Sequence, residues 1–181
     1  FGTYDETLLA GNSDGEIFKQ TFEGVYDTNL RYVDDQIKRL YRSIVESPDE
    51  TLCVVVGDHG EATGEHTAEI REWFEYPRQQ SGYGHGMDLF QESINVPLYV
   101  NDTDSVETSQ PITSTIDIVP TILNILDAQV DEPMDGRSLS EAIPTNRTVI
   151  SQDVAMGYEQ LAVIDNNRTQ YMSAKTNIEQ C

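Results

Sequence analysis

An aspartate and a histidine follow directly on the most apolar stretch of the chain. Leu52 to Val56 contains three valines in a row, Gly57 ends the stretch, and Asp58 and His59 come next. A carboxylate oxygen beside an imidazole nitrogen can bind a divalent metal ion. Two adjacent ligands do not complete such a site, so further groups must come from elsewhere in the fold. The dipeptide alone equally fits a local role, in which Asp58 caps a turn and His59 packs nearby.

The other two histidines follow within a short distance. His85 stands between Gly84 and Gly86, and His66 follows Gly64 and Glu65. Flanking glycines allow close backbone approach and leave an imidazole unobstructed, which suits contact with an oxyanion or proton transfer to a leaving group. The alternative for His85 is a flexible loop position without function. His85 is thus the catalytic and substrate-binding candidate, whereas His66 is the weaker substrate-binding candidate because its context also fits a plain turn.

The segment 67–83 separates the two histidine-bearing stretches. It holds Trp73, the only tryptophan of the chain, together with Arg71 and Tyr76. Aromatic and arginine side chains could shape the mouth of a substrate site. The sequence favours the alternative, a packed surface loop.

The apolar run 52–56 must position Asp58 and His59. It is too short for a helix and suits a buried strand of a parallel sheet. Open α/β sheets place their sites at the carboxyl ends of strands, which is where these two residues fall. Before the strand, apolar residues recur every three or four positions over 15–45 and predict one long amphipathic helix that packs on the sheet.

The remaining pattern predicts further helices and strands. Helical segments are expected at 87–92, 115–126 and 138–143, and strands at 94–100, 148–151, 161–164 and 169–172. Pro97 would place its strand at an edge or a bulge. We therefore expect an N-terminal loop over 1–14, an α/β core over 15–145, and C-terminal short strands of the same domain over 146–181.

The charge of the chain is extreme. The 181 residues hold 32 acidic and 11 basic side chains, which gives a net charge of -21. The acids are spread along a chain with ordinary apolar periodicity, so disorder is a poor interpretation. Such a surface keeps a protein hydrated in concentrated salt, which predicts a halophilic source. It disfavours nucleic acid and anionic membranes as partners.

Cysteine content and targeting signals give little further information. Cys53 lies in the apolar run and fits a buried small hydrophobe, and Cys181 is the last residue, so no disulfide framework is expected. No apolar run has the length of a membrane span. Because the sequence begins with Phe1, an upstream segment is expected. The compartment stays open between the cytoplasm of a halophile and export by an upstream signal, and the oligomeric state is not predicted.

Several short blocks occur in the order found in the sulfatase family of the alkaline-phosphatase-like superfamily. They are Tyr-Val-Asp-Asp-Gln-Ile at 32–37, Gly-Asp-His-Gly-Glu at 57–61, Gly-Glu-His at 64–66, Gly-His-Gly at 84–86, Asn-Val-Pro-Leu at 95–98, Asp-Ile-Val-Pro-Thr at 117–121 and Asp-Gly-Arg-Ser-Leu at 135–139. The chain resembles this family over residues 20–145. The resemblance implies an α/β sandwich with a mostly parallel sheet flanked by helices, of which the chain is the C-terminal part.

The resemblance also implies roles for three residues. Asp58 and His59 match the pair that binds the active-site cation, usually calcium in sulfatases. His85 matches the lysine or histidine that contacts the sulfate or assists the leaving group. The chain departs from the family by lacking the Cys/Ser-x-Pro-x-Arg motif that yields the formylglycine nucleophile, which we expect upstream. The chain alone is therefore expected to be inactive.

Two other functions stay open. Members of the same superfamily hydrolyse phosphoesters or phosphonates, or transfer phosphoglycerol groups, with a related metal site and a different nucleophile. From a separate class, a non-catalytic binding domain could retain the fold. The resemblance favours a sulfate-ester hydrolase.

Overall fold

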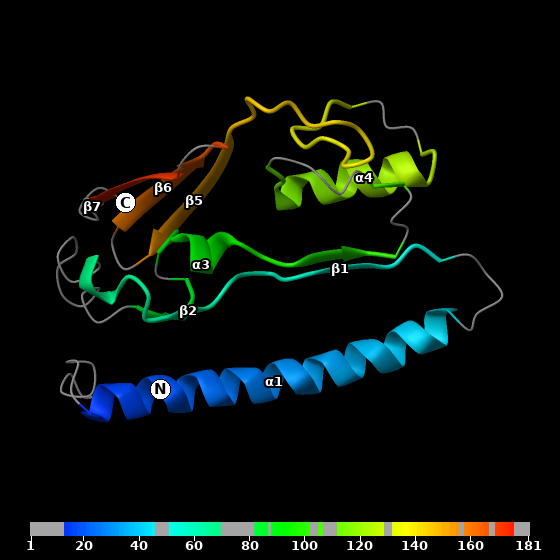
Figure 1. Ribbon diagram of the computed structural model, residues 1–181. Coiled ribbons are helices and arrows are strands. Elements are labelled where there is room, and N and C mark those ends of the chain that lie inside the picture. The colour runs from blue at the N-terminus through cyan, green and yellow to red at the C-terminus, as the bar shows by residue number, and fades with distance from the viewer. Residues whose placement is uncertain are drawn as a thin grey trace. The chain divides into compact units, whose positions relative to one another are not determined.

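The computed structural model describes residues 13–45, 51–69, 82–86, 88–101, 105–106, 112–128, 132–155, 158–166 and 169–175. The chain divides into two compact units. The first comprises Phe1–Thr51 and Gly60–Met87, and the second comprises Leu52–His59 and Asp88–Cys181. The described elements form a mixed α/β protein (Figure 1).

The first unit contains the long helix that the periodicity predicts. Helix α1 runs over Ser13–Val45 as a continuous 33-residue helix. Side chains four residues apart form ion pairs along it, Lys19 with Glu23 and Lys38 with Asp34, as expected for neighbours on one helical face. Phe22 packs edge-to-face against the ring of Tyr83, with centroids 5.6 Å apart. That contact ties α1 to the hairpin of the same unit.

The hairpin consists of two short antiparallel strands, β2 (Ala62–Thr63) and β3 (Tyr83–Gly84). Ala62 pairs with Gly84, and Thr63 pairs with Tyr83. Gly64 follows β2 with a φ of +95°, and a Cβ there would lie 2.6 Å from the ring of Tyr83. Glycine is therefore required at this position for both its backbone angle and the close approach of the ring.

The second unit contains the valine run, which pairs in a different direction from the one expected. Strand β1 (Val54–Val56) pairs antiparallel with β4 (Leu98–Val100), with Val55 opposite Tyr99. The prediction of a parallel sheet is not confirmed, because every strand pair among the described residues is antiparallel. The prediction of a fully buried strand is wrong, since Val56 is 40% exposed. β-Branched residues favour strands of either direction, so composition alone does not encode the pairing.

The helix expected near residue 115 is present. It begins as a 3-10 turn, η4 (Thr115–Asp117), and continues as α4 (Ile118–Ile125), with Pro120 in the first turn of α4. A shorter helix, α3 (Gln91–Ile94), precedes β4. The helix expected over 138–143 is wrong: the segment forms turns and bends. Within it the N–H of Leu139 donates to the hydroxyl of Thr121, and just before it the N–H of Arg137 donates to Asp117.

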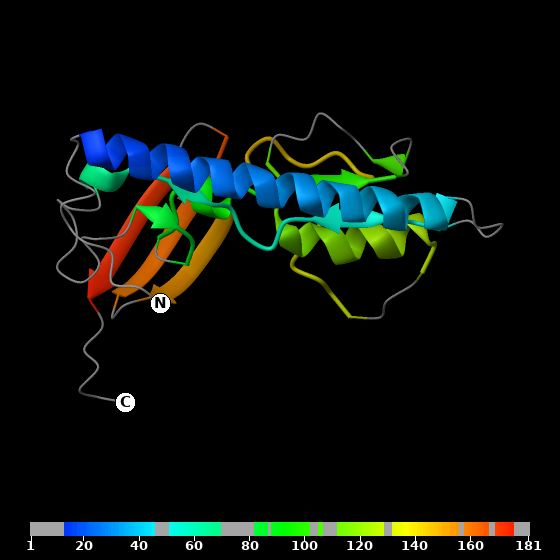
Figure 2. The same cartoon turned by 90° about the horizontal axis from the view of Figure 1, so that it is seen from below.

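The three C-terminal strands are confirmed and are longer than expected. β5 (Val149–Ala155), β6 (Tyr158–Ile164) and β7 (Thr169–Lys175) form one antiparallel sheet in the order β5-β6-β7. The three strands lie side by side in both views (Figures 1 and 2). Gln160 and Ala162 on the central strand are fully buried.

Asp117 is the centre of a buried network in the second unit. Its side chain has no exposed surface and accepts two hydrogen bonds from the Arg147 guanidinium, at 2.6 and 2.7 Å. It also accepts from the backbone N–H groups of Ser114 at 2.8 Å and Arg137 at 2.9 Å. The carboxylate thus joins the start of η4 to the segment before β5. Gly136 fits the same junction closely, because a Cβ there would overlap the carbonyl of Ile116.

These contacts predict how acid affects the second unit. Burial acts to raise the pKa of Asp117, but the hydrogen bonds from Arg147, Arg137 and Ser114 outweigh it and hold that pKa below its usual value. An unfolded aspartate has a pKa of about 3.9. The stabilisation by Asp117 is therefore complete at pH values above that pKa and is lost as the pH falls through the lower pKa of the folded state. Urea midpoints measured from about pH 6 to about pH 2 should fall more steeply for the native chain than for Asp117→Asn; parallel curves would contradict the prediction.

No helix in the described part of the chain is both long and apolar enough to cross a membrane.

Candidate functional site

Asp58 and His59 follow β1 after Gly57, at the end of the second unit's first segment. The backbone N–H of His59 donates to Asp58 Oδ1 at 3.0 Å, which fixes the carboxylate relative to its neighbour. The Nε2 atom of His59 lies 3.7 Å from the same oxygen. The side chain of Asp58 is 91% exposed and that of His59 is 42% exposed. Both side chains are open to a ligand.

The geometry of this pair fits two ligands of one cation. Ligand atoms each about 2.0–2.6 Å from a metal ion stand roughly 3–4 Å apart at ordinary coordination angles. The separation of 3.7 Å between imidazole nitrogen and carboxylate oxygen lies in that range. A carboxylate suits calcium, magnesium or manganese, and an imidazole suits zinc and other transition-metal ions. The pair therefore fits a divalent cation without selecting one.

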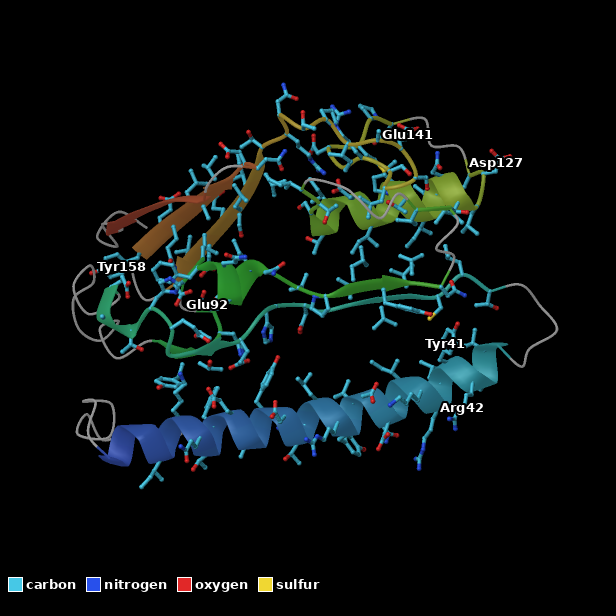
Figure 3. All side chains as sticks on the ribbon, viewed as in Figure 1. Tyr41, Arg42, Glu92, Asp127, Glu141 and Tyr158 are labelled. Atoms are coloured by element: carbon cyan, nitrogen blue, oxygen red, sulfur yellow. The ribbon has the colours of Figure 1, made fainter. Side chains whose placement is uncertain are left out.

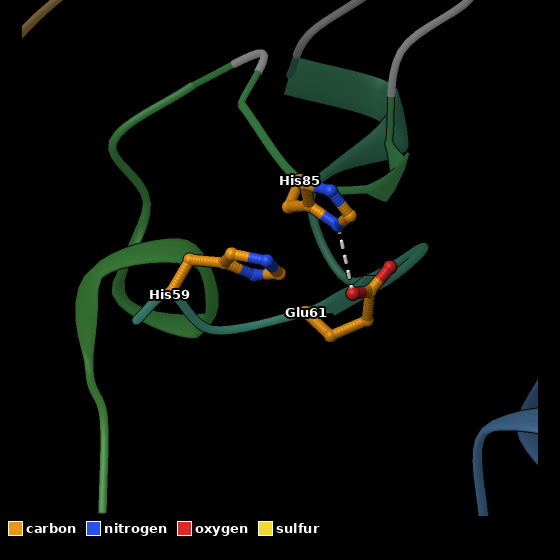
Figure 4. Close-up of side chains that lie close together, drawn as sticks. All are labelled: His59, Glu61 and His85. Atoms are coloured by element: carbon orange, nitrogen blue, oxygen red, sulfur yellow. Dashed lines mark hydrogen bonds and ion pairs between the residues drawn. The ribbon is translucent and has the colours of Figure 1, made fainter. Parts of the chain in front are cut away.

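His85 and Glu61 form the second group, within the first unit. Nδ1 of His85 lies 2.9 Å from Oε2 of Glu61, drawn as a dashed line in Figure 4. The Glu61 side chain is only 13% exposed, whereas that of His85 is 52% exposed. Gly84 and Gly86 on either side of the histidine have φ values of +94° and +72°, which disfavour any other residue. A largely buried carboxylate thus anchors an accessible imidazole.

His66 occupies the turn after β2 and is half-buried. The adjacent Glu65 accepts hydrogen bonds from the backbone N–H and the hydroxyl of Thr63, at 2.7 and 2.5 Å. Burial acts to raise the pKa of Glu65, but these bonds from Thr63 outweigh it and lower that pKa. The turn is therefore fixed by its own hydrogen bonds, and the role of His66 in substrate binding stays a prediction.

Most of the segment expected to shape a substrate mouth lies outside the described residues. Trp73, Arg71 and Tyr76 fall in the range 70–81, which the structure does not describe. The described ends of the segment are Thr67 and Tyr83, and Thr67 donates a hydrogen bond to the carbonyl of Gly64.

The predicted residues thus fall into two local groups, one in each unit. Asp58 and His59 are adjacent after β1, and His85 follows β3. Glu61 was missed by sequence reasoning, although it directly precedes β2. Only the pairing of β2 with β3 reveals its relation to His85, and no local pattern signals that pairing across the intervening residues.

A cleft in the second unit offers no comparable chemistry. It has a volume of about 810 Å³ and lies among η4, β4 and the β5–β6 hairpin. Apolar and amide side chains line it, including Ile116, Ile150 and Asn166, and Asp165 is the one charged residue among them. The cleft contains none of the predicted site residues.

The family comparison covers most of the chain. The model of the family described as Sulfatase matches residues 9–128. That range includes Asp58, His59, His66 and His85, as well as Glu61.

A curated relative gives a consistent result. The chain is 27% identical over 132 residues to the multifunctional alkaline phosphatase superfamily protein PehA of Trinickia caryophylli. The matched region is 70% of this chain but spans only 22% of that protein. No solved structure matches the chain. Because the family model covers well over half of the sequence, the chain belongs to the sulfatase family.

Proposed function

We propose that the chain carries the downstream site residues of a metal-dependent sulfuric ester hydrolase. The observation that supports this most directly is that the family match over 9–128 contains Asp58, His59 and His85, the residues selected by their chemistry. The adjacent carboxylate and imidazole after β1 fit a divalent cation, for which calcium is the family's usual choice. Asp58 and His59 hold that cation in the proposal, and His85 and His66 contact the ester.

The cation supplies charge stabilisation for the sulfate oxygens and for the group that attacks sulfur. The side chains of Asp58 and His59 orient it by their fixed position after β1. His85 either donates a hydrogen bond to a sulfate oxygen or gives the proton from its ring nitrogen to the leaving oxygen as the ester S–O bond breaks.

The nucleophile of the proposed reaction comes from outside these 181 residues. No Cys/Ser-x-Pro-x-Arg motif occurs in the sequence, so formylglycine and the remaining metal ligands would lie upstream in the native protein. Intact-mass measurement of that protein and sequencing of its N-terminal peptides test this. A heavier chain with an aldehyde in such a motif is the expected result, and a native chain of 181 residues would refute it.

A second candidate is hydrolysis of phosphoesters or phosphonates at the same site. It is favoured by the name of the relative, a multifunctional protein of the alkaline phosphatase superfamily. Turnover of matched aryl sulfates, aryl phosphates and aryl phosphonates by the native protein separates the two candidates. A higher kcat/KM for the sulfate supports the first proposal, and the reverse order supports the second. If the native protein turns over none of these esters, the non-catalytic binding domain is the remaining alternative.

The metal assignment predicts a specific loss of cation affinity. In the native protein, Asp58→Asn and His59→Gln should each weaken calcium binding by tenfold or more, because even outer-shell partners of metal ligands are worth about 10–100-fold. A net charge of -21 also attracts cations without specificity. Calorimetric titration should therefore be done in about 1 M salt, where the Debye length is about 3 Å.

Glu23→Gln, which removes a partly exposed carboxylate on α1, is the matched control and should bind calcium as the native protein does. Equal affinities for Asp58→Asn and the control would refute the assignment. Parallel titrations with manganese and zinc determine which cation binds best.

A further inference from the structure

The pairing of β2 with β3 places Glu61 opposite His85. Ala62 faces Gly84 and Thr63 faces Tyr83 in this antiparallel ladder. The next pair in the same register is Glu61 and His85, one residue beyond the ends of the two strands. Side chains that stand opposite each other in such a ladder are near neighbours. The hydrogen bond between them is thus a product of the hairpin register.

Contacts of the Tyr83 side chain, away from Glu61 and His85, stabilise the hairpin. The ring of Tyr83 covers Gly64 and also packs edge-to-face against Phe22 of α1. These contacts fix the register, and the register fixes the positions of residues 61 and 85. The position of the Glu61 carboxylate beside His85 is therefore set by the backbone pairing of the two strands.

The chemistry of the contact defines the state of the imidazole. An ionised carboxylate can only accept hydrogen bonds, so Nδ1 of His85 is the donor in the 2.9 Å contact. In the neutral ring the lone pair then resides on Nε2, and in the protonated ring Nε2 carries the second N–H. Nε2 therefore accepts a proton in the neutral ring, and it gives up a proton or donates to an anion in the protonated ring.

The residues beside His85 cannot supply this orientation. Gly84 and Gly86 have no side chains, and a Cβ added at Gly86 would meet nothing within 4 Å. A Cβ added at Gly84 would meet only Glu61, at 3.7 Å. The carboxylate of Glu61 is a group that the hairpin brings to the ring.

We propose that Glu61 is the positioning residue of His85, holding its ring by Nδ1 and presenting Nε2 to the substrate. The catalytic consequence rests on the proposed ester hydrolysis, whereas the tautomer of His85 does not. The two parts are therefore tested by different measurements.

The tautomer is tested by nitrogen NMR of the chain with labelled histidine. The chain has three histidines, and His85→Gln assigns the relevant ring. The spectrum is recorded on the neutral rings, in which only one nitrogen carries a proton, so that the two nitrogens differ strongly in shift. We expect His85 to carry its proton on Nδ1 in the native chain and in Glu61→Gln, whose amide oxygen still accepts. Glu61→Ala should shift the proton to Nε2.

Glu23→Ala removes a carboxylate of the same unit and should leave the His85 signals unchanged. The native spectrum alone can refute the proposal if His85 carries its proton on Nε2, so the test does not depend on whether Glu61→Ala folds. An unchanged spectrum in a folded Glu61→Ala chain would refute it equally.

The catalytic consequence is tested on the native protein. Glu61→Ala should lower kcat roughly 10–100-fold with little change in KM, as for partners that orient a ligating histidine. Glu61→Gln should retain most of kcat, and adding Glu61→Ala to His85→Ala should cause no further loss. Full kcat in Glu61→Ala would overturn the positioning role. Absence of ester turnover in the native protein would overturn the proposed function. The nitrogen NMR spectrum would still determine whether Nδ1 of His85 donates to Glu61.

Discussion

Asp117→Ala is expected to destabilise the second unit by about 3–5 kcal/mol, the cost of breaking a buried ion pair by removing one partner. The Asp117 side chain is fully buried, and that of Arg147 is only 10% exposed. Alanine would leave the guanidinium without its carboxylate and would also remove the acceptor for the N–H groups of Ser114 and Arg137. A loss of this size is a large part of the stability of an ordinary domain.

Amide hydrogen exchange is the suitable measurement, because it reports on each unit separately. The N–H groups of Arg137 and Leu139 should exchange about 100-fold to 3,000-fold faster in Asp117→Ala, since about 1.4 kcal/mol corresponds to a factor of ten. Exchange in α1, which belongs to the first unit, should change little. The result would refute the role of Asp117 if exchange at both amides rose less than tenfold.

Asp127→Asn is the matched control for the charge. Asp127 lies exposed just after α4, in the same unit, and is labelled in Figure 3. Its φ of 50° is a left-handed conformation that asparagine also tolerates. The free energy of unfolding of this variant should therefore lie within about 0.5 kcal/mol of that of the native chain.

The sequence predicted the helices and strands well where periodicity carried the signal. The steps of three and four over 15–45 correspond to α1, and the three C-terminal strand candidates correspond to β5, β6 and β7. The helix expected over 138–143 is wrong: the segment forms turns and bends. The N–H groups of Leu139, inside it, and of Arg137, just before it, donate to Thr121 and Asp117. Such contacts join residues about 20 positions apart and leave no local pattern.

For strand direction and for the candidate site as well, local features were predictable from the sequence and contacts between distant residues were not. The valines of β1 indicated a strand but not its antiparallel partner, since β-branching fits both directions. Residue type and glycine spacing were enough to select Asp58, His59 and His85. Glu61 was not found, because its importance depends on the register of β2 against β3 across a long insertion. Candidate site residues can thus be proposed from sequence and stay predictions, whereas cross-strand partners need the fold.

His85→Ala is expected to lower kcat of the native protein about 10²–10⁴-fold, the usual contribution of a positioned proton donor or acceptor. KM should change little if the imidazole acts mainly in the transition state. His66→Ala should instead raise KM with a smaller effect on kcat, because its proposed role is to bind the ester. Steady-state kinetics with aryl sulfates measure both effects. Equal kcat in His85→Ala and the native protein would exclude a catalytic role.

The dependence on the leaving group distinguishes the two possible roles of His85. If its Nε2–H gives a proton to the departing oxygen, the loss in His85→Ala should grow with the pKa of the phenol released, since poor leaving groups need protonation most. If it donates to a sulfate oxygen instead, the loss should be nearly uniform across the series. His85→Lys then provides an independent check. A lysine ammonium can replace an imidazole that only contacts an anion, but it is a poorer replacement for an imidazole that Glu61 orients. A uniform loss with recovery by lysine would assign His85 to the sulfate, and a graded loss without recovery would assign it to the leaving group.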